Sequence, residues 1–230
     1  MTDLHTHILP GVDDGAQSMD EALAMLHMQA QQGVNVVALT PHFYKNRESV
    51  DDFLNRRELA WTQLLAATKD QECPELVLGA EVAWMPDITE WPELESLCYQ
   101  GTKMLLVELP IFPWTADVFN SLYNLEGRRG VMPIIAHVER YFHYQKKNDI
   151  ERLLKMGYPI QVSAKALSKF SLRKKALKLL ELYEGLLISD CHNLQNRVPN
   201  LGDAMKIVEK KLGRQASKEF AEITDALLTD

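Results

Sequence analysis

Short apolar runs alternate with amphipathic segments along the chain, and this alternation restricts the fold more than any other feature. The runs are rich in Val, Ile and Leu, which is typical of parallel strands buried on both faces. We expect seven strands, at residues 2–5, 34–40, 76–82, 104–109, 132–137, 159–162 and 186–190. We expect helices at residues 18–33, 49–70, 116–126, 149–156, 171–183, 201–212 and 217–228. This α/β order favours a βα barrel or a doubly wound sheet.

Bulk composition then excludes several classes of protein. The length of 230 residues fits a single domain over residues 1–230. The formal net charge is −7 and no basic block stands out, which disfavours binding to nucleic acid. The sequence shows no signal peptide and no apolar stretch that could span a membrane. Cys73, Cys98 and Cys191 follow no disulfide spacing, so we expect a cytoplasmic protein without membrane insertion.

Histidines and acidic residues recur where the predicted strands end. This set comprises His5, His7, His42, Glu81, Glu108, His137, Asp190 and His192. In a parallel barrel these strand ends lie on one face, where barrel enzymes carry their chemistry. Glu81 and Glu108 interrupt apolar runs, and a buried carboxylate needs a partner or a metal. The pattern therefore predicts a metal site, whereas His27 and His143 are interpreted as ordinary structural or surface residues.

The spacing of the ligands supports this prediction. Side chains two residues apart point to the same face of an extended chain, so His5 and His7 can bind one ion. Asp190 and His192 repeat this spacing with mixed ligands. Nitrogen and oxygen ligands without thiolates suit Mn²⁺, Fe²⁺ or Zn²⁺ in a catalytic site. The number of candidate ligands exceeds the need of one ion, and Glu81 could bridge two ions, as carboxylates do in two-metal hydrolases.

Longer motifs carry a resemblance to a known family. HILPGVDDG, TPH, GAEV, LLVELP, PIIAHVERY and ISDCHNLQNR follow one another along nearly the whole chain. Together with an initial D-x-H-x-H, they resemble the polymerase and histidinol phosphatase (PHP) superfamily. Within it, the chain looks like the bacterial capsule-biosynthesis tyrosine-protein phosphatases. The resemblance implies a distorted barrel of about seven βα units that holds two to three divalent ions, with Mn²⁺ favoured and Fe²⁺ or Zn²⁺ as alternatives.

The resemblance also implies roles for particular residues. One ion would bind His5, His7, Glu81 and Asp190, and a second would share Glu81 and add Glu108 and His137. A third would bind His42, His192 and an acid of the pair Asp13-Asp14, of which we favour Asp14. Arg140 and Arg197 match family arginines that hold phosphate, so we expect them beside the cluster with free guanidinium groups.

The chain departs from the family pattern at four places, one of which is the C-terminus, where the usual Asn-Pro-containing tail is not found. Phe43 stands where a second histidine is common, and Cys191 stands where a small residue is usual. Ala164-Lys165 replaces a usual Gly-Ser pair. None of these positions is an inferred ligand, so the departures bear on substrate preference and on the rim of the pocket.

A competing motif points to cysteine chemistry. The segment from Cys191 to Arg197 fits C-x5-R, the signature of thiol-based tyrosine phosphatases. Such loops wrap the phosphate with backbone N–H groups and usually need glycine, which this segment lacks. Asp190 would also raise the pKa of a neighbouring thiol. We therefore interpret the match as coincidental.

The resemblance implies a metal-dependent phosphatase that hydrolyses phosphotyrosine in proteins. Its partner would be a tyrosine-autophosphorylated bacterial kinase that controls capsular or exopolysaccharide biosynthesis. We expect direct attack by water without a covalent phosphoenzyme. Two alternatives stay open: a PHP-type phosphatase for small molecules such as histidinol phosphate or a sugar phosphate, and a metal-binding regulatory module without turnover. Homo-oligomerisation stays open as well.

Overall fold

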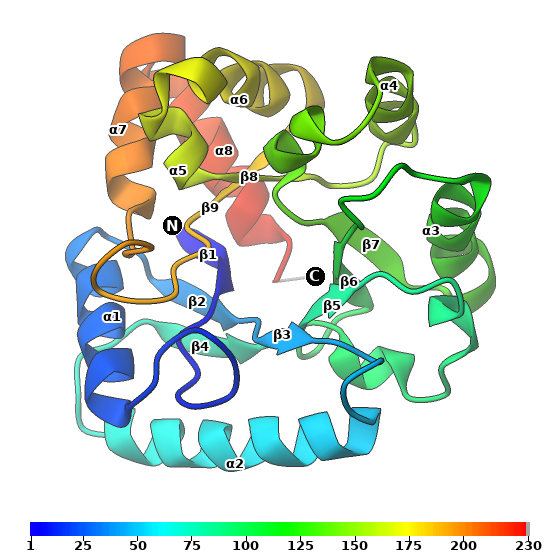
Figure 1. Ribbon diagram of the computed structural model, residues 1–230. Coiled ribbons are helices and arrows are strands. Elements are labelled where there is room, and N and C mark those ends of the chain that lie inside the picture. The colour runs from blue at the N-terminus through cyan, green and yellow to red at the C-terminus, as the bar shows by residue number, and fades with distance from the viewer. Residues whose placement is uncertain (229–230) are drawn as a thin grey trace.

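Nine short strands, all paired in parallel, carry the fold of residues 1–228, which a computed structural model describes (Figure 1). The strands are β1 (Thr2–Thr6), β2 (Val36–Leu39), β3 (His42–Phe43), β4 (Glu75–Leu78), β5 (Glu81–Ala83), β6 (Met104–Glu108), β7 (Met132–Ile135), β8 (Gln161–Ser163) and β9 (Leu186–Ile188). They form three sheets, in the orders β1-β2-β4, β3-β5-β6-β7 and β8-β9. The last two residues of the predicted domain, 229–230, lie outside the described part.

The three sheets follow one another around a ring. A single bridge between Ile135 and Ile160 joins β7 to the start of β8, and another between Thr6 and Cys191 joins β1 to the end of β9. Because these two junctions are single bridges and not ladders, the sheet does not close as a continuous barrel. This arrangement matches the distorted α/β barrel that the sequence resemblance implies.

The third predicted strand, residues 76–82, is broken in two, and a short strand that was not predicted, β3, follows the second. Pro41, which has no N–H to donate to a ladder, separates β2 from β3, and Gly79 precedes the break between β4 and β5. Hydrogen bonds continue across both breaks, since the Thr40 N–H donates to the Thr6 carbonyl over 2.9 Å and the Glu81 N–H donates to the Pro41 carbonyl over 3.0 Å. The seven predicted strands thus compare with nine observed ones.

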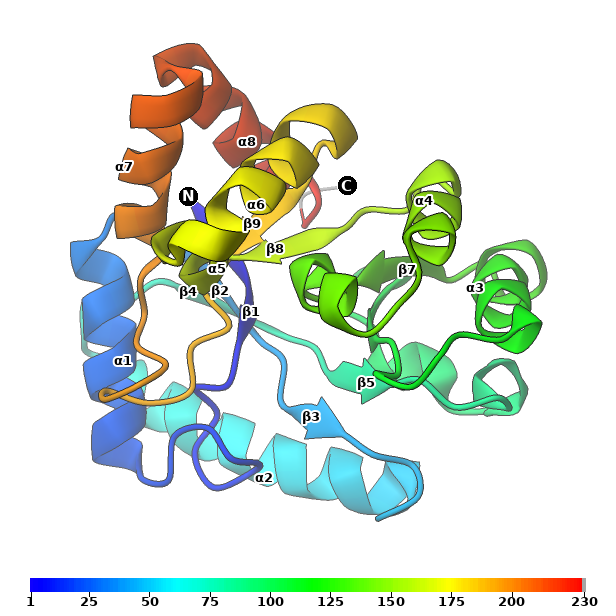
Figure 2. The ribbon, with the colours of Figure 1, turned by 45° about the horizontal axis from the view of Figure 1, so that its top comes forward.

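Helices surround the strands on the outside (Figures 1 and 2). They are α1 (Met19–Gln31), α2 (Val50–Thr68), α3 (Ala116–Arg129), α4 (Lys147–Lys155), α5 (Ala164–Ser168), α6 (Phe170–Tyr183), α7 (Leu201–Leu212) and α8 (Arg214–Ala226). Three 3₁₀ turns complete the set: η1 (Ile88–Glu90), η2 (Leu94–Leu97) and η3 (Val138–His143). Ser18 caps α1 by accepting from the Glu21 N–H over 3.2 Å, as the sequence predicts. The short helix α5 was not expected.

The core has two parts, one inside the ring and one between the strands and the helices. The inner part holds Leu4, Ala38, Tyr99, Leu106, Ile134, Ala136, Leu186 and Ile188, which are buried. Ile223 and Leu227 pack against it, together with Met104, the first residue of β6. The C-terminal helix therefore covers the end of the ring where the strands begin, which leaves the opposite end to the polar side chains.

A bulge in β1 sets the direction of the first two histidines. Asp3 pairs with Val37, but the next paired residue, Thr6, is matched to Leu39, so β1 carries one extra residue. Asp3 consequently turns toward α1, where its carboxylate accepts from Gln29 Nε2 over 2.6 Å. His5 turns toward the polar end of the ring.

Candidate metal centre and active site

The structure brings all nine predicted metal ligands together where the parallel strands end. Eight come from β1, β3, β5, β6 and the segments that follow β1, β7 and β9, and Asp14 comes from the loop before α1. Three overlapping groups of side chains lie close enough to hold an ion: His7, Asp14, His42 and His192; His5, His7 and Glu81; and His42, Glu81 and Glu108. The role of these residues as ligands stays a prediction that this arrangement supports.

Glu81 lies at the centre of the cluster and is almost completely buried. Its Oε2 is 3.1 Å from His5 Nε2 and 2.9 Å from His42 Nδ1. Its Oε1 is 2.8 Å from His137 Nε2. Since one carboxylate contacts histidines of different groups, Glu81 has the position that a ligand shared between two ions requires.

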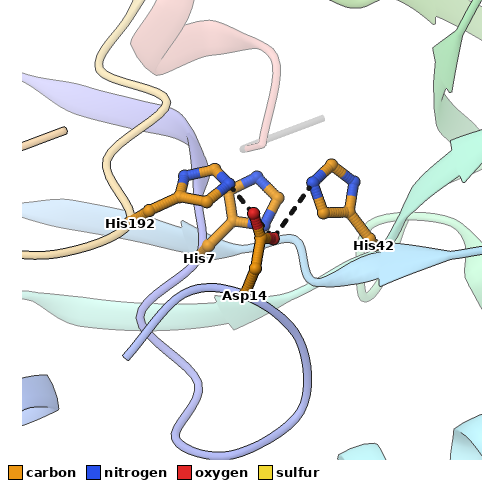
Figure 3. A group of neighbouring side chains, drawn as sticks. All are labelled: His7, Asp14, His42 and His192. Carbon is orange, nitrogen blue, oxygen red and sulfur yellow. Dashed lines mark ion pairs between the residues drawn. The ribbon is translucent and has the colours of Figure 1, made fainter. Parts of the chain in front are cut away.

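Asp14 and three histidines form the group at the open edge of the cluster (Figure 3). Asp14 Oδ1 lies 3.5 Å from His42 Nε2 and 3.6 Å from His192 Nε2. The neighbouring Asp13 has a different task, because its Oδ2 lies 2.6 Å from His7 Nδ1 and accepts from the His42 N–H over 2.9 Å. This geometry supports the choice of Asp14 over Asp13 as the ligand of the third ion.

Glu108 completes the cluster on the side of β6. Its Oε1 lies 3.5 Å from His137 Nε2, and Glu108 also belongs to the group with His42 and Glu81. The set expected for the second ion, Glu81, Glu108 and His137, is therefore assembled, with His42 close enough to join it.

Several polar atoms of this cluster are buried without a hydrogen-bond partner in residues 1–228. They are His42 Nδ1, Glu81 Oε2, His137 Nδ1 and His192 Nε2. All but His137 Nδ1 lie within ion-pair distance of another member of the cluster, but none of these contacts has the alignment of a hydrogen bond. A buried polar atom without a partner destabilises the fold by about 1–3 kcal/mol, whereas a coordinated cation would satisfy it. The donors are all nitrogen and oxygen, which suits Mn²⁺, Fe²⁺ or Zn²⁺. The residues present thus fit a divalent metal centre.

Electrostatic coupling within the cluster is strong. Burial opposes the charge on Glu81, but His5 and His42 outweigh it and hold the Glu81 pKa well below its usual value. Burial would lower the pKa of His42, yet the carboxylates of Glu81 and Asp13 raise it to about 9. Burial and the charge of Glu81 raise the pKa of Glu108 to about 7. Without an ion, the cluster therefore holds protons where a metal would bind.

Two residues outside the predicted set orient the first two histidines. His5 Nδ1 lies 2.7 Å from Gln161 Oε1, and His7 Nδ1 is held by Asp13. These contacts turn the Nε2 atoms of both rings toward Glu81, and the two atoms lie 3.1 Å apart. Such outer contacts fix the tautomer and direction of a metal-binding imidazole. Gln161 could have been found as a polar residue at the end of an apolar strand.

Backbone strain accompanies two of the predicted ligands. In residues 1–228, the non-glycine residues with positive φ are His137 at 29°, Glu184 at 47° and Asp190 at 54°. Strained conformations persist where the surrounding structure fixes them, and they gather at functional sites. The positive φ at His137 and Asp190 agrees with a backbone that is held in a strained conformation so that both side chains point into the cluster.

Arg140 and Arg197 lie beside the cluster, as expected, but their guanidinium groups are not free. Both donate to the buried carboxylate of Asp190, with Arg197 Nη2 at 2.7 Å from Oδ1. Burial would raise the pKa of Asp190, but Arg140 and His5 lower it below its usual value. The side chains of Arg140 and Arg197 are 39% and 27% exposed, so each keeps an edge that an incoming anion can reach.

Cys191 points away from the cluster. Its side chain is fully buried, and its Sγ lies 3.7 Å from Gln29 Nε2 of α1. Burial and the charge of Asp3 raise the pKa of the thiol far above its usual value. An inaccessible thiol that stays protonated cannot act as a nucleophile, so the match to C-x5-R has no functional meaning here.

The two remaining histidines lie outside the cluster. His27 is exposed on α1, with its Nε2 2.8 Å from Gln31 Nε2, as expected for a surface residue. His143 lines a cavity of ≈ 380 Å³ that opens beside Glu108, His137 and Arg140. The cavity gives the cluster an approach for a substrate side chain.

A ring of parallel βα units with a His-, Asp- and Glu-rich cluster at its carboxyl ends defines the PHP class of metal-dependent proteins. Comparison with known families agrees. The chain belongs to the family "Capsular polysaccharide synthesis, CpsB/CapC", whose family model matches residues 1–227.

Curated relatives are similar over almost their whole length. Tyrosine-protein phosphatase CpsB of Streptococcus agalactiae serotype III is 28% identical over 99% of this chain and 98% of the relative. Tyrosine-protein phosphatase YwqE of Bacillus subtilis is 29% identical over 99% of this chain and 91% of the relative. A crystal structure from work on YwqE of Bacillus subtilis and CpsB of Streptococcus pneumoniae, described as metal-dependent tyrosine phosphatases, superposes with a TM-score of 0.81. It covers 100% of this chain and 94% of that one at 23% identity, and it confirms the fold.

A helix must be long and predominantly apolar to span a membrane. No helix within residues 1–228 is long and apolar enough to cross a bilayer.

Proposed function

We propose that this protein is a metal-dependent phosphatase that hydrolyses phosphotyrosine in proteins. One observation carries the proposal: a buried carboxylate, Glu81, lies among four histidines beside two arginines that reach the open face. The cluster fits divalent ions, and the arginines fit the oxygens of a phosphate. Curated relatives that match almost the whole chain are named tyrosine-protein phosphatases.

The residues that would hold the metals are those of the cluster. They are His5, His7, Asp14, His42, Glu81, Glu108, His137, Asp190 and His192. Two to three ions, with Mn²⁺ favoured over Fe²⁺ or Zn²⁺, would share this set, and Glu81 would be a ligand of two of them. When bound, such ions lower the pKa of water to near neutrality and offset the charge of a phosphoryl group.

The chain's own residues bind and orient the phosphate. A molecule with a net charge of −7 repels a phosphotyrosine dianion at long range, so attraction must come from local groups. Arg140 and Arg197 supply this attraction at the mouth of the cluster, and their planar forks can pair with two phosphate oxygens each. Asp190 holds both guanidinium groups in place before the substrate arrives. Pre-orientation of this kind reduces the entropy lost on binding.

We propose that no phosphoenzyme forms, because the histidines and carboxylates of the cluster would serve as metal ligands. Cys191 is buried behind the cluster, which leaves water as the nucleophile. The tyrosyl oxygen, with a pKa near 10, departs more readily than an alkyl alkoxide would. Family membership supports a role in capsular polysaccharide synthesis. We propose that the protein acts in the cytoplasm and that its partner is an autophosphorylated tyrosine kinase of capsular or exopolysaccharide synthesis. We further propose that residues 1–230 form one domain.

Substrate and metal can be tested together. The protein would be stripped with a chelator, reloaded separately with Mn²⁺, Fe²⁺ or Zn²⁺, and assayed with a phosphotyrosine peptide and with histidinol phosphate in ¹⁸O-labelled water. We expect Mn²⁺ to restore peptide hydrolysis and one labelled oxygen to enter the released phosphate. Higher kcat/KM for histidinol phosphate would favour a small-molecule phosphatase. Loaded protein that released no phosphate from any aryl ester would be a regulatory module.

The arginines can be tested by the substitutions Arg140→Lys and Arg197→Lys. Lysine keeps the charge but loses the fork, so kcat/KM should fall by about 1–3 kcal/mol, which corresponds to about 5- to 150-fold. The number of bound ions should not change, because neither residue is a ligand. As a matched control, Arg128→Lys on α3, outside the cavities around the cluster, should have no effect. If both Arg140→Lys and Arg197→Lys were kinetically silent, the phosphate-binding role would be wrong.

A further inference from the structure

A basic surface borders the proposed active site. Residues 164–178 contain six cationic residues and no Asp or Glu, although the whole chain is acidic. Five of them are exposed, and we refer to these five as the α5–α6 basic surface: Lys165, Lys169, Lys174, Lys175 and Lys178. Because the whole chain is acidic, its overall net charge does not reveal this basic segment. The expectation that no basic block stands out is therefore wrong. Figure 2 shows α5 and α6 in yellow, beside β8 and β9.

These lysines have no acidic partner in the part of the chain that the structure describes. Other exposed lysines do form ion pairs, such as Lys147 with Glu151 at 3.4 Å and Lys206 with Asp203 at 2.8 Å. Lys165 instead donates weakly to the Asn196 carbonyl over 3.4 Å. A row of unpaired cations in a protein of net charge −7 is available to an acidic ligand.

Two of the lysines lie next to the cluster. Lys165 and Lys169 line the ≈ 380 Å³ cavity that Glu108 and His137 also line. They line a second cavity of ≈ 220 Å³ together with Asp190 and Arg197. Arg140 borders both cavities, so the two lysines stand directly outside the groups that would bind the phosphate.

The larger cavity has an apolar wall as well. Ile111, Tyr144 and Leu172 line it in addition to the polar groups. A recess with an apolar wall and a few polar groups is typical of a site for a ring-bearing ligand. The cavity therefore suits the aryl ring of phosphotyrosine, with its phosphate at the arginines and the adjoining peptide at the lysines.

We propose that the site selects phosphotyrosines that lie in an acidic peptide segment, and that Lys165 and Lys169 bind Asp or Glu side chains flanking the phosphotyrosine. This inference rests on the proposed function and names its substrate class. The lysines border a recess and not a flat face, which favours a peptide side chain over a membrane surface. An extended peptide advances about 3.3 Å per residue, so acids within two or three residues of the phosphotyrosine are the ones in reach.

The test compares matched peptides on the metal-loaded protein. One phosphotyrosine peptide carries two Asp residues on each side, a second carries Asn at the same positions, and a third carries Lys. The parent protein should prefer the Asp peptide over the Asn peptide by roughly five- to tenfold in kcat/KM, mainly through KM. The preference should shrink in 0.5 M NaCl, because salt screens exposed charges.

Variants assign the preference to particular residues. In the double variant Lys165→Ala, Lys169→Ala, the ratio of Asp to Asn peptide should fall to about one. Lys169→Glu should shift the preference toward the Lys peptide, a gain that a misfolded protein would not show. Lys69→Ala, at the end of α2 and outside these cavities, serves as the matched control and should keep the parent ratio.

The outcomes separate this inference from the proposed function. If the parent protein hydrolysed p-nitrophenyl phosphate and the Asn peptide but showed no preference for Asp, the inference would be wrong and the function would stand. If it hydrolysed no aryl phosphate with any metal, the proposed function itself would fail. A third outcome is equal kcat/KM for the Asp and Asn peptides together with binding to phosphatidylglycerol vesicles that depends on the lysines. This result would overturn the inference in favour of a membrane surface.

Discussion

At the scale of single residues, protons and metal ions compete for the same atoms. His42 has a pKa of about 9 in the metal-free cluster because the carboxylates of Glu81 and Asp13 outweigh its burial. A metal binds only the neutral imidazole, so an incoming ion must displace this proton. His137 is the opposite case, since burial and Arg140 lower its pKa to about 4 and it needs no deprotonation near neutral pH.

This competition predicts how metal affinity depends on pH. A raised pKa means that His42 is protonated below about 9, so affinity should fall as the pH drops from 9, by about tenfold per unit for each proton displaced. Below pH 7, Glu108, with a pKa of about 7, adds a second proton and a steeper slope. Calorimetric titration with Mn²⁺ in buffers of different ionisation enthalpy counts the protons. Affinity that stayed constant from pH 6 to 9 would contradict the coupling.

Cys191 provides a second test at this scale. Because its thiol is buried against α1 and not in the cluster, Cys191→Ser should keep most of the activity at a modest loss of stability. Removal of metal by chelator should abolish the activity of both the parent and the variant. The measurement is kcat/KM together with metal content. A folded, metal-loaded Cys191→Ser protein without activity would restore the thiol mechanism.

At the scale of elements, the loop between β1 and α1 carries Asp13 and Asp14 to the cluster. Gly15 fixes the course of this loop, because a Cβ at this position would overlap the His7 carbonyl oxygen and lie 2.6 Å from His7 Cβ. The Gly15 N–H also donates to Asp13 Oδ1 over 2.9 Å. The glycine thus links the direction of His7 to the positions of both aspartates.

Substitution of this glycine should affect the site more than the fold. Gly15→Ala should displace the loop, lower the number of bound ions and reduce kcat/KM by at least about a hundredfold, since ligand misplacement of 1 Å has effects of this size. Gly11→Ala is the matched control, because a Cβ there meets nothing within 4 Å and only the φ of +69° is strained. It should destabilise the protein by about 1–2 kcal/mol and retain the metals. Metal analysis and thermal unfolding distinguish the two, and normal metal content in Gly15→Ala would refute this role of the loop.

Much of the fold was predictable because apolar periodicity reports burial directly. The strand at 104–109 and the helix at 201–212 agree closely with β6 and α7. The breaks after β2 and β4 were not foreseen, since their cause is the local effect of Pro41 and Gly79 within otherwise apolar runs. The hydrogen bond between Arg140 and Asp190 joins residues 50 positions apart, which no local pattern reveals. The ligand set was accessible because each member marks a strand end.

At the scale of the whole molecule, bound metal should contribute to stability. The ions would bind only the folded cluster, so at a free concentration of 100 times Kd each should stabilise the protein by about 2.7 kcal/mol. For a chain of this size, that corresponds to a rise of about 5–10 °C in Tm. Differential scanning calorimetry with and without chelator measures the shift. Glu81→Gln should lose most of it, and an equal Tm with and without Mn²⁺ would mean that the cluster binds no metal at these concentrations.

The bridge between β1 and the end of β9 gives the molecule a particular order of assembly. His5 and His7 are synthesised almost two hundred residues before Asp190 and His192. A nascent chain therefore presents its first histidines long before the partners that would complete their coordination sphere. Such distant contacts form late and slowly, because a long loop must close first. Binding of the full predicted set of ions would accordingly have to wait until Asp190 and His192 are synthesised, and a chain interrupted before Asp190 would lack two of the nine predicted ligands.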